Sequence, residues 1–234
     1  MSMSSNKTVT RAARLVLLRH GEVASHRGDV PVTEPGLTHA ERTGKVLGGI
    51  DGRFTVLFGG TRRTRETAEA LCRGIGDQDR TGEPVESFAL RNPDLYLAGT
   101  RVNMVSSHAA LAEQIPGMTE TEAEASEWWS TFISHTDRIG WWLRDANPPG
   151  DTAHDVATRL LRFAASLTDP GPMSSTTVIG VTHSPVLRAV LHHATGADSG
   201  EPAYVTGVQI TLTGSDTPRI QAFDPLADLP GDRT

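Results

Sequence analysis

The sequence predicts an α/β protein. We expect a three-layer α/β/α sandwich whose central sheet is mostly parallel, with helices on both faces and a helical insertion near residues 100–150. Apolar runs of strand length alternate with helix-length segments along the 234 residues, which is typical of strands joined by crossover helices. Two of these runs end directly in a histidine, which places two histidines at one edge of the sheet. We expect a single domain over 1–234, with 100–150 as a cap within it.

The first part of the chain predicts three strands and two helices. Residues 15–18 (LVLL) form a continuous apolar run, as expected for a strand covered on both faces. A turn and a helix follow over 31–50, where apolar residues recur every three or four positions. Residues 54–58 (FTVLF) predict the second strand and 64–75 the second helix. Residues 84–90 predict a third, weaker strand.

The middle of the chain differs in composition. It holds all four tryptophans, at positions 128, 129, 141 and 142. Apolar residues four and three positions apart predict a long helix over 125–143, and Thr119 with Glu122 predicts a capping box. We expect the tryptophans to form a core; the alternative is that they stack on a ligand.

The last part continues the alternation. Residues 156–167 predict a helix and 176–181 (TTVIGV) the strongest later strand. The next helix is expected to have Ser184 as its N-cap, with a proline in the first turn. Residues 205–214 predict the last strand, and the tail at 224–234 is expected to be loose.

Composition narrows the classes of function. The net charge of −6 disfavours non-specific nucleic-acid binding, which needs a basic surface. No apolar run approaches the roughly 20 residues of a membrane span. The apolar run near the N-terminus is too short for a signal peptide, so we expect a cytoplasmic protein. The single cysteine, Cys72, excludes an internal disulfide framework.

Arginines accompany the two strand-end histidines. Arg19 precedes His20 at the end of the first strand, and His183 follows a later strand. Where the second strand turns into its helix, the chain has Arg62, Arg63 and Arg65. A transferring phosphoryl group needs an in-line nucleophile and cationic donors around its oxygens, and helix N-termini attract anions. Guanidinium charge keeps a neighbouring imidazole neutral and nucleophilic. These residues predict a phosphate pocket with a histidine nucleophile and no metal.

The motifs resemble those of the histidine phosphatase superfamily, in its phosphoglycerate-mutase-like branch. LVLLRHGE (15–22) is similar to the family's RHG signature, and VTHSPVLRAVL (181–191) to its second-histidine segment. RTRETAEAL (63–71) is similar to the Arg-Ala-x-x-Thr-Ala helix, which selects Arg63 among its neighbours. PVTEPGLTHA (31–40) and PGDTAHDVATRLLRF (149–163) resemble two further family segments. The matches follow the family's order and cover residues 15 to 191.

The resemblance implies a two-step mechanism. His20 attacks phosphorus to form a phosphohistidine, which water then hydrolyses. Arg19, Arg63 and His183 bind the phosphoryl oxygens, and we add Ser184 to the phosphate-binding set. Glu22 is expected to orient the pocket's arginines.

The general acid is where the chain departs from the family. Asn92 falls at the position of the usual glutamate. Asp94 is the nearest carboxylate, and we expect it to protonate the leaving oxygen. Weaker alternatives are Asp151, Glu127 and Glu113. A substrate with a good leaving group needs no acid, and Asn92 suits hydrogen bonding to substrate.

A second departure lies at His26, where family members often have asparagine. His26 and Arg27 are expected to contact phosphate or substrate; the alternative is a solvated loop.

The predicted function is hydrolysis of a phosphomonoester of a small phosphorylated metabolite. The alternatives are a phosphoglycerate-type mutase and a non-catalytic phosphate-binding module. Asn92 and the insertion at 100–150 count against the mutase, and intact His20 and His183 count against the binding module. We expect no cofactor, no nucleic-acid partner and no membrane partner. The substrate's identity and the oligomeric state, a dimer included, stay open.

Overall fold

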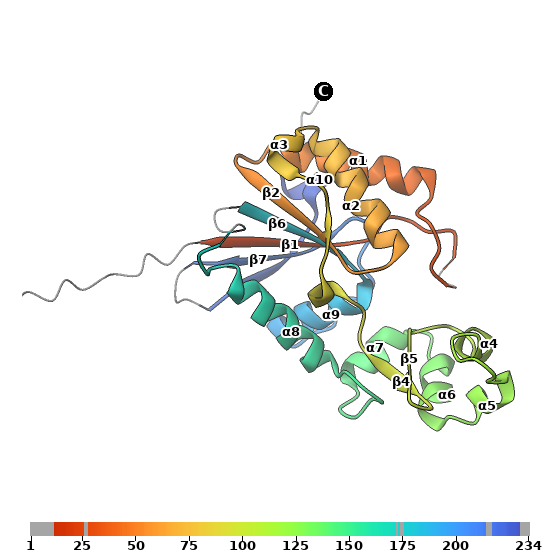
Figure 1. The fold of residues 1–234 in the computed structure, drawn as a ribbon. Helices are drawn as coiled ribbons and strands as arrows, with labels where there is room; N and C mark the ends of the chain where they lie inside the picture. The colour runs from red at the N-terminus through yellow and green to blue at the C-terminus, as the bar shows by residue number, and fades with distance from the viewer. Residues whose placement is uncertain (1–11, 26–27, 172, 174–175, 214–216, 230–234) are drawn as a thin grey trace, which may run out of the picture.

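A six-stranded sheet forms the centre of the computed structural model, which describes residues 12–25, 28–171, 173, 176–213 and 217–229. The strand order is β3-β2-β6-β1-β7-β8 (Figure 1). The bounds are Ala13–Arg19 for β1, Arg53–Phe58 for β2, Val85–Glu86 for β3, Thr176–Thr182 for β6, Gly207–Leu212 for β7 and Arg219–Phe223 for β8. The first four strands in this order run parallel; β7 is antiparallel to β1, and β8 is antiparallel to β7. The sheet is therefore mixed and mostly parallel, as predicted.

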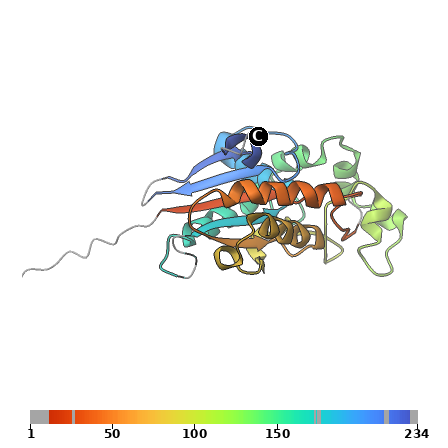
Figure 2. The ribbon, with the colours of Figure 1, turned by 90° about the horizontal axis from the view of Figure 1, so that it is seen from above.

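Helices cover both faces of the sheet (Figures 1 and 2). One face carries α1 (Glu34–Gly48), α2 (Arg62–Ile75), α3 (Gln78–Thr81) and α10 (Pro225–Asp228), and the other carries α8 (Ala153–Ser166) and α9 (Ser184–Thr195). Successive side chains of β1 enter opposite cores. Leu15 and Leu17 pack on the α8–α9 side, and Val16 and Leu18 on the α1–α2 side. Both faces of β1 are apolar because both are buried, which confirms the three-layer prediction.

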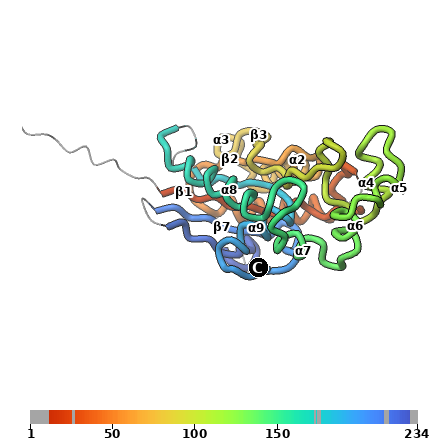
Figure 3. The backbone as a smooth tube through the Cα atoms, turned by 90° about the horizontal axis from the view of Figure 1, so that it is seen from below, coloured from red at the N-terminus to blue at the C-terminus, as the bar shows by residue number. Residues whose placement is uncertain are grey.

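The insertion lies beyond the carboxyl ends of the strands (Figures 1 and 3). It opens with a hairpin that the sequence analysis did not predict, β4 (Leu95–Leu97) paired with β5 (Thr100–Val102). Its helices are α4 (His108–Ala112), α5 (Glu120–Glu124), α6 (Glu127–Ser134) and α7 (Arg138–Arg144). The capping box of Thr119 and Glu122 is present at the start of α5. We call residues 95–150 the cap.

The tryptophans form the core of the cap. Trp129 and Trp142 are fully buried, and Trp128 stacks on Phe132 with ring centroids 5.3 Å apart. The indole of Trp128 donates a hydrogen bond to Asp145 at 2.6 Å. Aromatic burial thus holds the short cap helices together, in agreement with the core interpretation.

Several predicted elements differ in the structure. The strand expected over 84–90 is only β3, followed by the 3-10 helix η1 (Phe88–Leu90). The long helix expected over 125–143 is two helices, because the backbone is extended at His135 and Asp137 caps a new helix by accepting a hydrogen bond from Gly140 N.

The C-terminal third of the chain holds further differences. The N-cap of α9 is His183, not Ser184, because the Ser184 hydroxyl donates to a carboxylate instead of capping. Strand β8 was not predicted, and part of the tail expected to be loose forms α10.

Candidate active site

Sheet register brings the two histidines together. In the parallel pair β1–β6, Arg19 stands opposite Thr182, so the next residues, His20 and His183, leave the sheet side by side. The His20 amide donates to Thr182 O at 3.0 Å. The two imidazole centroids are 5.5 Å apart, and both side chains are buried. The prediction that both lie at one sheet edge is therefore correct.

The glycine after His20 is required by close packing. A Cβ at Gly21 would lie 2.8 Å from Val32 Cγ1, and the Gly21 amide donates to Thr67 Oγ1 at 2.8 Å. The Gly21 carbonyl accepts from His20 Nδ1 at 2.8 Å. A carbonyl can only accept, so the proton of a neutral His20 ring lies on Nδ1 and the lone pair on Nε2. This tautomer suits nucleophilic attack by Nε2.

Arg63 orients the second histidine. It lies in the first turn of α2, and its Nη2 donates to His183 Nδ1 at 3.5 Å. The proton of His183 is then on Nε2, a buried atom with no hydrogen-bond partner among the described residues. Burial, the largest cause, and the charges of Arg63, His20 and Arg19 hold the pKa of His183 well below its usual value. His183 is thus a neutral hydrogen-bond donor at Nε2, and an anionic oxygen in the cavity would be a suitable acceptor.

Arg19 is held from three sides. Its Nη1 donates to Pro202 O at 2.6 Å, its Nη2 pairs with Glu201 Oε1 at 2.8 Å, and its guanidinium lies 4.1 Å from the Tyr204 ring centroid. The Nε atoms of Arg19 and Arg63 are buried and unpartnered within the described part of the chain. Buried cationic donors of this kind favour an anionic ligand.

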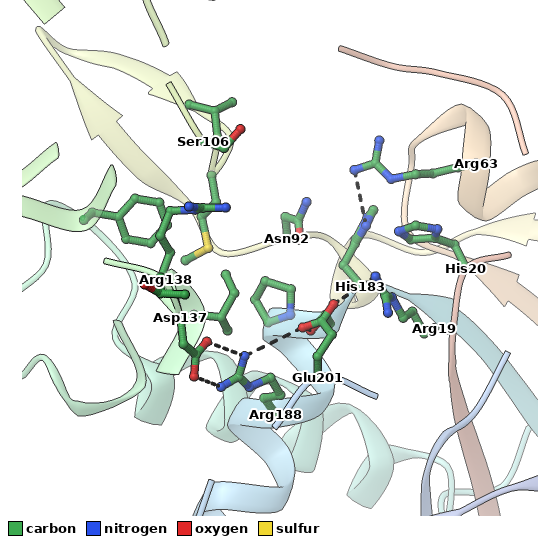
Figure 4. A pocket seen from close by; sticks show the side chains of 17 residues that line it. Arg19, His20, Arg63, Asn92, Ser106, Asp137, Arg138, His183, Arg188 and Glu201 are labelled. Carbon is green, nitrogen blue, oxygen red and sulfur yellow. Dashed lines mark hydrogen bonds and ion pairs between the residues drawn. The ribbon is translucent and has the colours of Figure 1, made fainter. Parts of the chain in front are cut away.

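A cavity of about 510 Å³ joins these residues to the cap (Figure 4). The sheet edge contributes Arg19, His20, Arg63 and His183. The cap contributes Met104, Val105, Ser106, Phe132, Thr136, Asp137, Arg138 and Ile139. None of the four tryptophans lines this cavity. The site therefore has a cationic end at the sheet and a mixed apolar and polar wall in the cap.

Asp94 does not fit the role expected of it. Its carboxylate accepts from Arg91 Nη2 at 2.7 Å, pairs with Arg101, and does not line the cavity. The hydrogen bonds and charges of these two arginines outweigh burial and lower the pKa of Asp94. A carboxylate held ionised outside the cavity has no proton to give a leaving group.

The alternative carboxylates are also outside the cavity. Asp151 pairs with Arg159 at 2.9 Å and accepts from the Asp94 amide at 3.0 Å. Glu127 and Glu113 are exposed on the cap. The geometry therefore leaves the general acid to be found elsewhere.

The remaining predicted residues differ in where they lie relative to the cavity. Asn92 and Ser184 line the cavity, and Asn92 Oδ1 is a buried acceptor with no partner in the described residues. Glu22 is exposed, accepts from Thr33 Oγ1 at 3.1 Å and does not line the cavity. His26 and Arg27 lie outside the described residues.

Four charged cavity residues were missed by sequence reasoning: Asp137, Arg138, Arg188 and Glu201. Arg188 is 2% exposed, bonds Asp137 at 2.9 and 2.8 Å, and pairs with Asp198. An arginine inside the apolar helix PVLRAVL was a usable signal for a buried ion pair. Glu201 lies in a loop with no motif, so nothing in the sequence pointed to it.

Two further findings concern the described residues alone. They contain no group of three or more His, Cys, Asp or Glu side chains placed to hold a metal ion. None of their helices is both long enough and apolar enough to cross a membrane.

Solved structures with a similar fold include phosphatases and a mutase. A mycobacterial glucosyl-3-phosphoglycerate phosphatase is 22% identical, with a TM-score of 0.57 over 94% of this chain and 98% of that one. Its complex with inorganic phosphate is 21% identical, with a TM-score of 0.56 over 91% and 96%. A phosphoglycerate mutase from Bacillus anthracis is 14% identical, with a TM-score of 0.60 over 93% and 95%. These likenesses establish the fold.

Comparison of the sequence with protein families gives the identification. No curated protein matches the sequence significantly. The model of the histidine phosphatase superfamily (branch 1) matches residues 15–86 and 96–221, which is most of the chain and includes His20, Arg63 and His183. The strand-end histidines and the arginines around them lie within the matched segments, and the chain belongs to the histidine phosphatase superfamily, branch 1.

Proposed function

We propose that this protein is a phosphatase that hydrolyses a phosphomonoester of a small metabolite through a phosphohistidine on His20. The observation that carries the proposal is that Arg19, Arg63 and His183 line the same cavity as His20, and each has a buried nitrogen without a hydrogen-bond partner among the described residues. Phosphoryl transfer depends on such positioning and on charge stabilisation more than on covalent machinery.

Each residue has a distinct role in the proposal. His20 Nε2 forms the bond to phosphorus, in line with the leaving oxygen. Arg19 and Arg63 neutralise the charge on the outer oxygens, and His183 donates its Nε2 proton to one of them as a neutral hydrogen-bond donor. Asn92 and Ser184 are further polar groups at the cavity, suited to binding substrate.

A mutase would begin with the same phosphohistidine and differ only in returning the phosphoryl group to a hydroxyl. We favour hydrolysis because Asn92 replaces the usual glutamate and because the cap, rather than a family motif, supplies the far wall of the cavity. A cytoplasmic location and a single domain that includes the cap remain parts of the proposal.

The test is phosphate release from a panel of phosphorylated sugars, nucleotides and small acids, with wild type beside His20→Ala. We expect release by the wild type and none by the variant. Arg63→Ala should lower kcat/KM by about 10²- to 10³-fold, because a donor to the transferring group is lost. Arg65→Ala is the matched control. It lies on the same helix turn, but its half-exposed side chain pairs with Glu69 at 3.8 Å and does not line the cavity.

Two outcomes would contradict the proposal. Phosphate release that persists in His20→Ala would show that the reaction does not pass through a phosphohistidine on His20. No release from any compound by folded wild type would favour a mutase, seen as movement of phosphate within the substrate, or a phosphate-binding module.

A further inference from the structure

The usual position of the general acid is occupied by an amide, and two carboxylates line the cavity: Asp137 and Glu201. The Asp137 carboxylate already accepts hydrogen bonds from other groups of the protein. It caps α7 through Gly140 N at 2.9 Å and accepts two hydrogen bonds from Arg188. The bonds from Arg188, the largest cause, lower the pKa of Asp137 to about 2. Asp137 therefore stays ionised and cannot donate a proton at neutral pH.

Glu201 has a different environment. It comes from the loop between α9 and β7, and its side chain is 50% exposed. Oε1 pairs with Arg19 Nη2 at 2.8 Å, and Oε2 accepts from Ser184 Oγ at 2.5 Å (Figure 4). Arg188 Nη1 is 3.7 Å from Oε2. Glu201 thus bridges a phosphate-binding arginine and the residue after His183, at the cavity's cationic end.

A phosphoryl group bound by Arg19 changes this arrangement. The dianion takes the guanidinium that now pairs with Glu201 and places negative charge beside the carboxylate. Two negative charges brought close together repel each other, and a proton shared with the leaving oxygen relieves that repulsion.

We propose that Glu201 is the proton donor of this enzyme, in place of the family's glutamate at position 92. The inference rests on the proposed phosphatase function. In the first step His20 Nε2 forms a bond to phosphorus as the bond to the leaving oxygen breaks, and that oxygen takes the electron pair and the proton of Glu201. In the second step the Glu201 carboxylate accepts a proton from water, whose oxygen bonds to phosphorus as the N–P bond breaks and its electron pair returns to His20.

The test is the dependence of Glu201→Gln on the leaving group. An alkyl phosphate needs a proton on its leaving oxygen, whereas p-nitrophenolate leaves without one. We expect kcat/KM for the best alkyl substrate of the panel to fall by about 10²-fold or more, and that for p-nitrophenyl phosphate to change only a few-fold. The ratio of the two is the readout. A partly misfolded preparation lowers both rates equally and leaves the ratio unchanged.

Two variants serve as comparisons. Glu41→Gln makes the same change on α1, at a glutamate that pairs with Lys45 at 4.0 Å and does not line the cavity, and should leave both rates at the wild-type level. Asp94→Asn tests the carboxylate expected from the sequence and should leave the ratio unchanged.

Three results would overturn the inference. The first is an equal loss on both substrates, which indicates a positioning role only. The second is a lower KM with unchanged kcat, which makes Glu201 a competitor for the phosphate site. The third is a leaving-group effect in Asp94→Asn instead. Failure of the phosphatase proposal is separate, because it would appear as wild-type activity that is absent or that survives His20→Ala.

Discussion

The protonation of single side chains decides what the residues at the sheet edge can do. His183 is buried between two arginines and another histidine, and the folded protein keeps it neutral. A neutral ring accepts from Arg63 at Nδ1 and donates from Nε2, whereas an imidazolium could not accept at all. Burial, with the nearby arginines, therefore keeps this donor neutral, and Arg63 sets its direction.

The same burial makes stability depend on pH. The pKa of His183 is lowered in the folded state from an unfolded value of 6.5, so below about pH 6.5 the unfolded chain binds a proton that the folded chain does not. The free energy of unfolding should therefore fall as pH decreases below that value, by up to about 1.4 kcal/mol per pH unit for one proton. Denaturant unfolding in phosphate-free buffers between pH 5 and 7 measures the slope.

The matched variants are His183→Asn and His193→Asn. The first removes the buried imidazole and should flatten the slope. The second changes an exposed histidine on the same helix and should keep it. An unchanged slope in His183→Asn would show that other groups account for the acid sensitivity.

Sequence reasoning at this scale predicted correctly where residues lie when their position follows directly from a strand end. Arg19, His20 and His183 follow from strands that were recognisable as apolar runs. It failed for Asp94, whose place in the chain suggested a donor. Its charge state depends on Arg101 across the β4–β5 hairpin, which the sequence analysis did not predict.

Helix packing is governed by two glycines on facing helices. A Cβ at Gly44 of α1 would lie 2.2 Å from Leu71 O, and one at Gly74 of α2 would lie 2.0 Å from Glu41 O. Only hydrogen fits where these backbones meet. This contact positions α2, and with it Arg63 at the helix start.

Gly44→Ala should therefore destabilise the protein. Overpacking costs typically 1–3 kcal/mol, which outweighs the gain of about 1 kcal/mol in helix propensity, so we expect a net loss of about 1–2 kcal/mol. Chemical denaturation measures it. Gly171→Ala is the control, because an added Cβ there meets no atom within 4 Å. A more stable Gly44→Ala protein would contradict the close packing of α1 on α2.

Element boundaries were predicted well where apolar spacing was regular, as in α1, α2 and α8. The break between α6 and α7 was missed because the apolar spacing continues through it. Tertiary bonds from Asp137 to Arg188 favour the break, and these partners are distant in sequence. The break matters to the site because it brings Asp137, Arg138 and Ile139 to the cavity wall.

At the scale of the whole molecule, the sheet edge and the cap contribute different parts of one cavity. Under the proposed function, the sheet edge would bind the phosphoryl group and the cap would face the rest of the substrate. Arg138 lies on the cap side, away from His20 (Figure 4), and its Nη1 makes a long bond of 3.4 Å to His135 O. Its guanidinium is therefore available to a polar or anionic substituent of the substrate.

Arg138→Ala should raise KM for the best substrate of the panel by about 10-fold or more, as expected for a lost charge-assisted hydrogen bond. It should leave p-nitrophenyl phosphate turnover unchanged, because that substrate has no second charged group. Arg144→Ala, an exposed change on the same helix outside this cavity, is the control. An equal loss of activity on both substrates would contradict the proposal that Arg138 binds a part of the substrate other than the phosphoryl group.

Local chemistry was enough to predict the α/β class, the strand-end histidines and the arginine at the start of α2. Burial pattern, helix spacing and the alternation of strands with helices are properties that a sequence carries directly. Only the tertiary structure shows the cap's hairpin and the ion pairs of Asp94 and Asp137. The same is true of the contact between Glu201 and Arg19. Asp94 and Arg101 are near in sequence, but they meet only when the hairpin has formed. The contacts of Asp137 with Arg188 and of Glu201 with Arg19 join residues far apart in the chain, whose distance is set when the sheet, the C-terminal loop and the cap pack around one cavity.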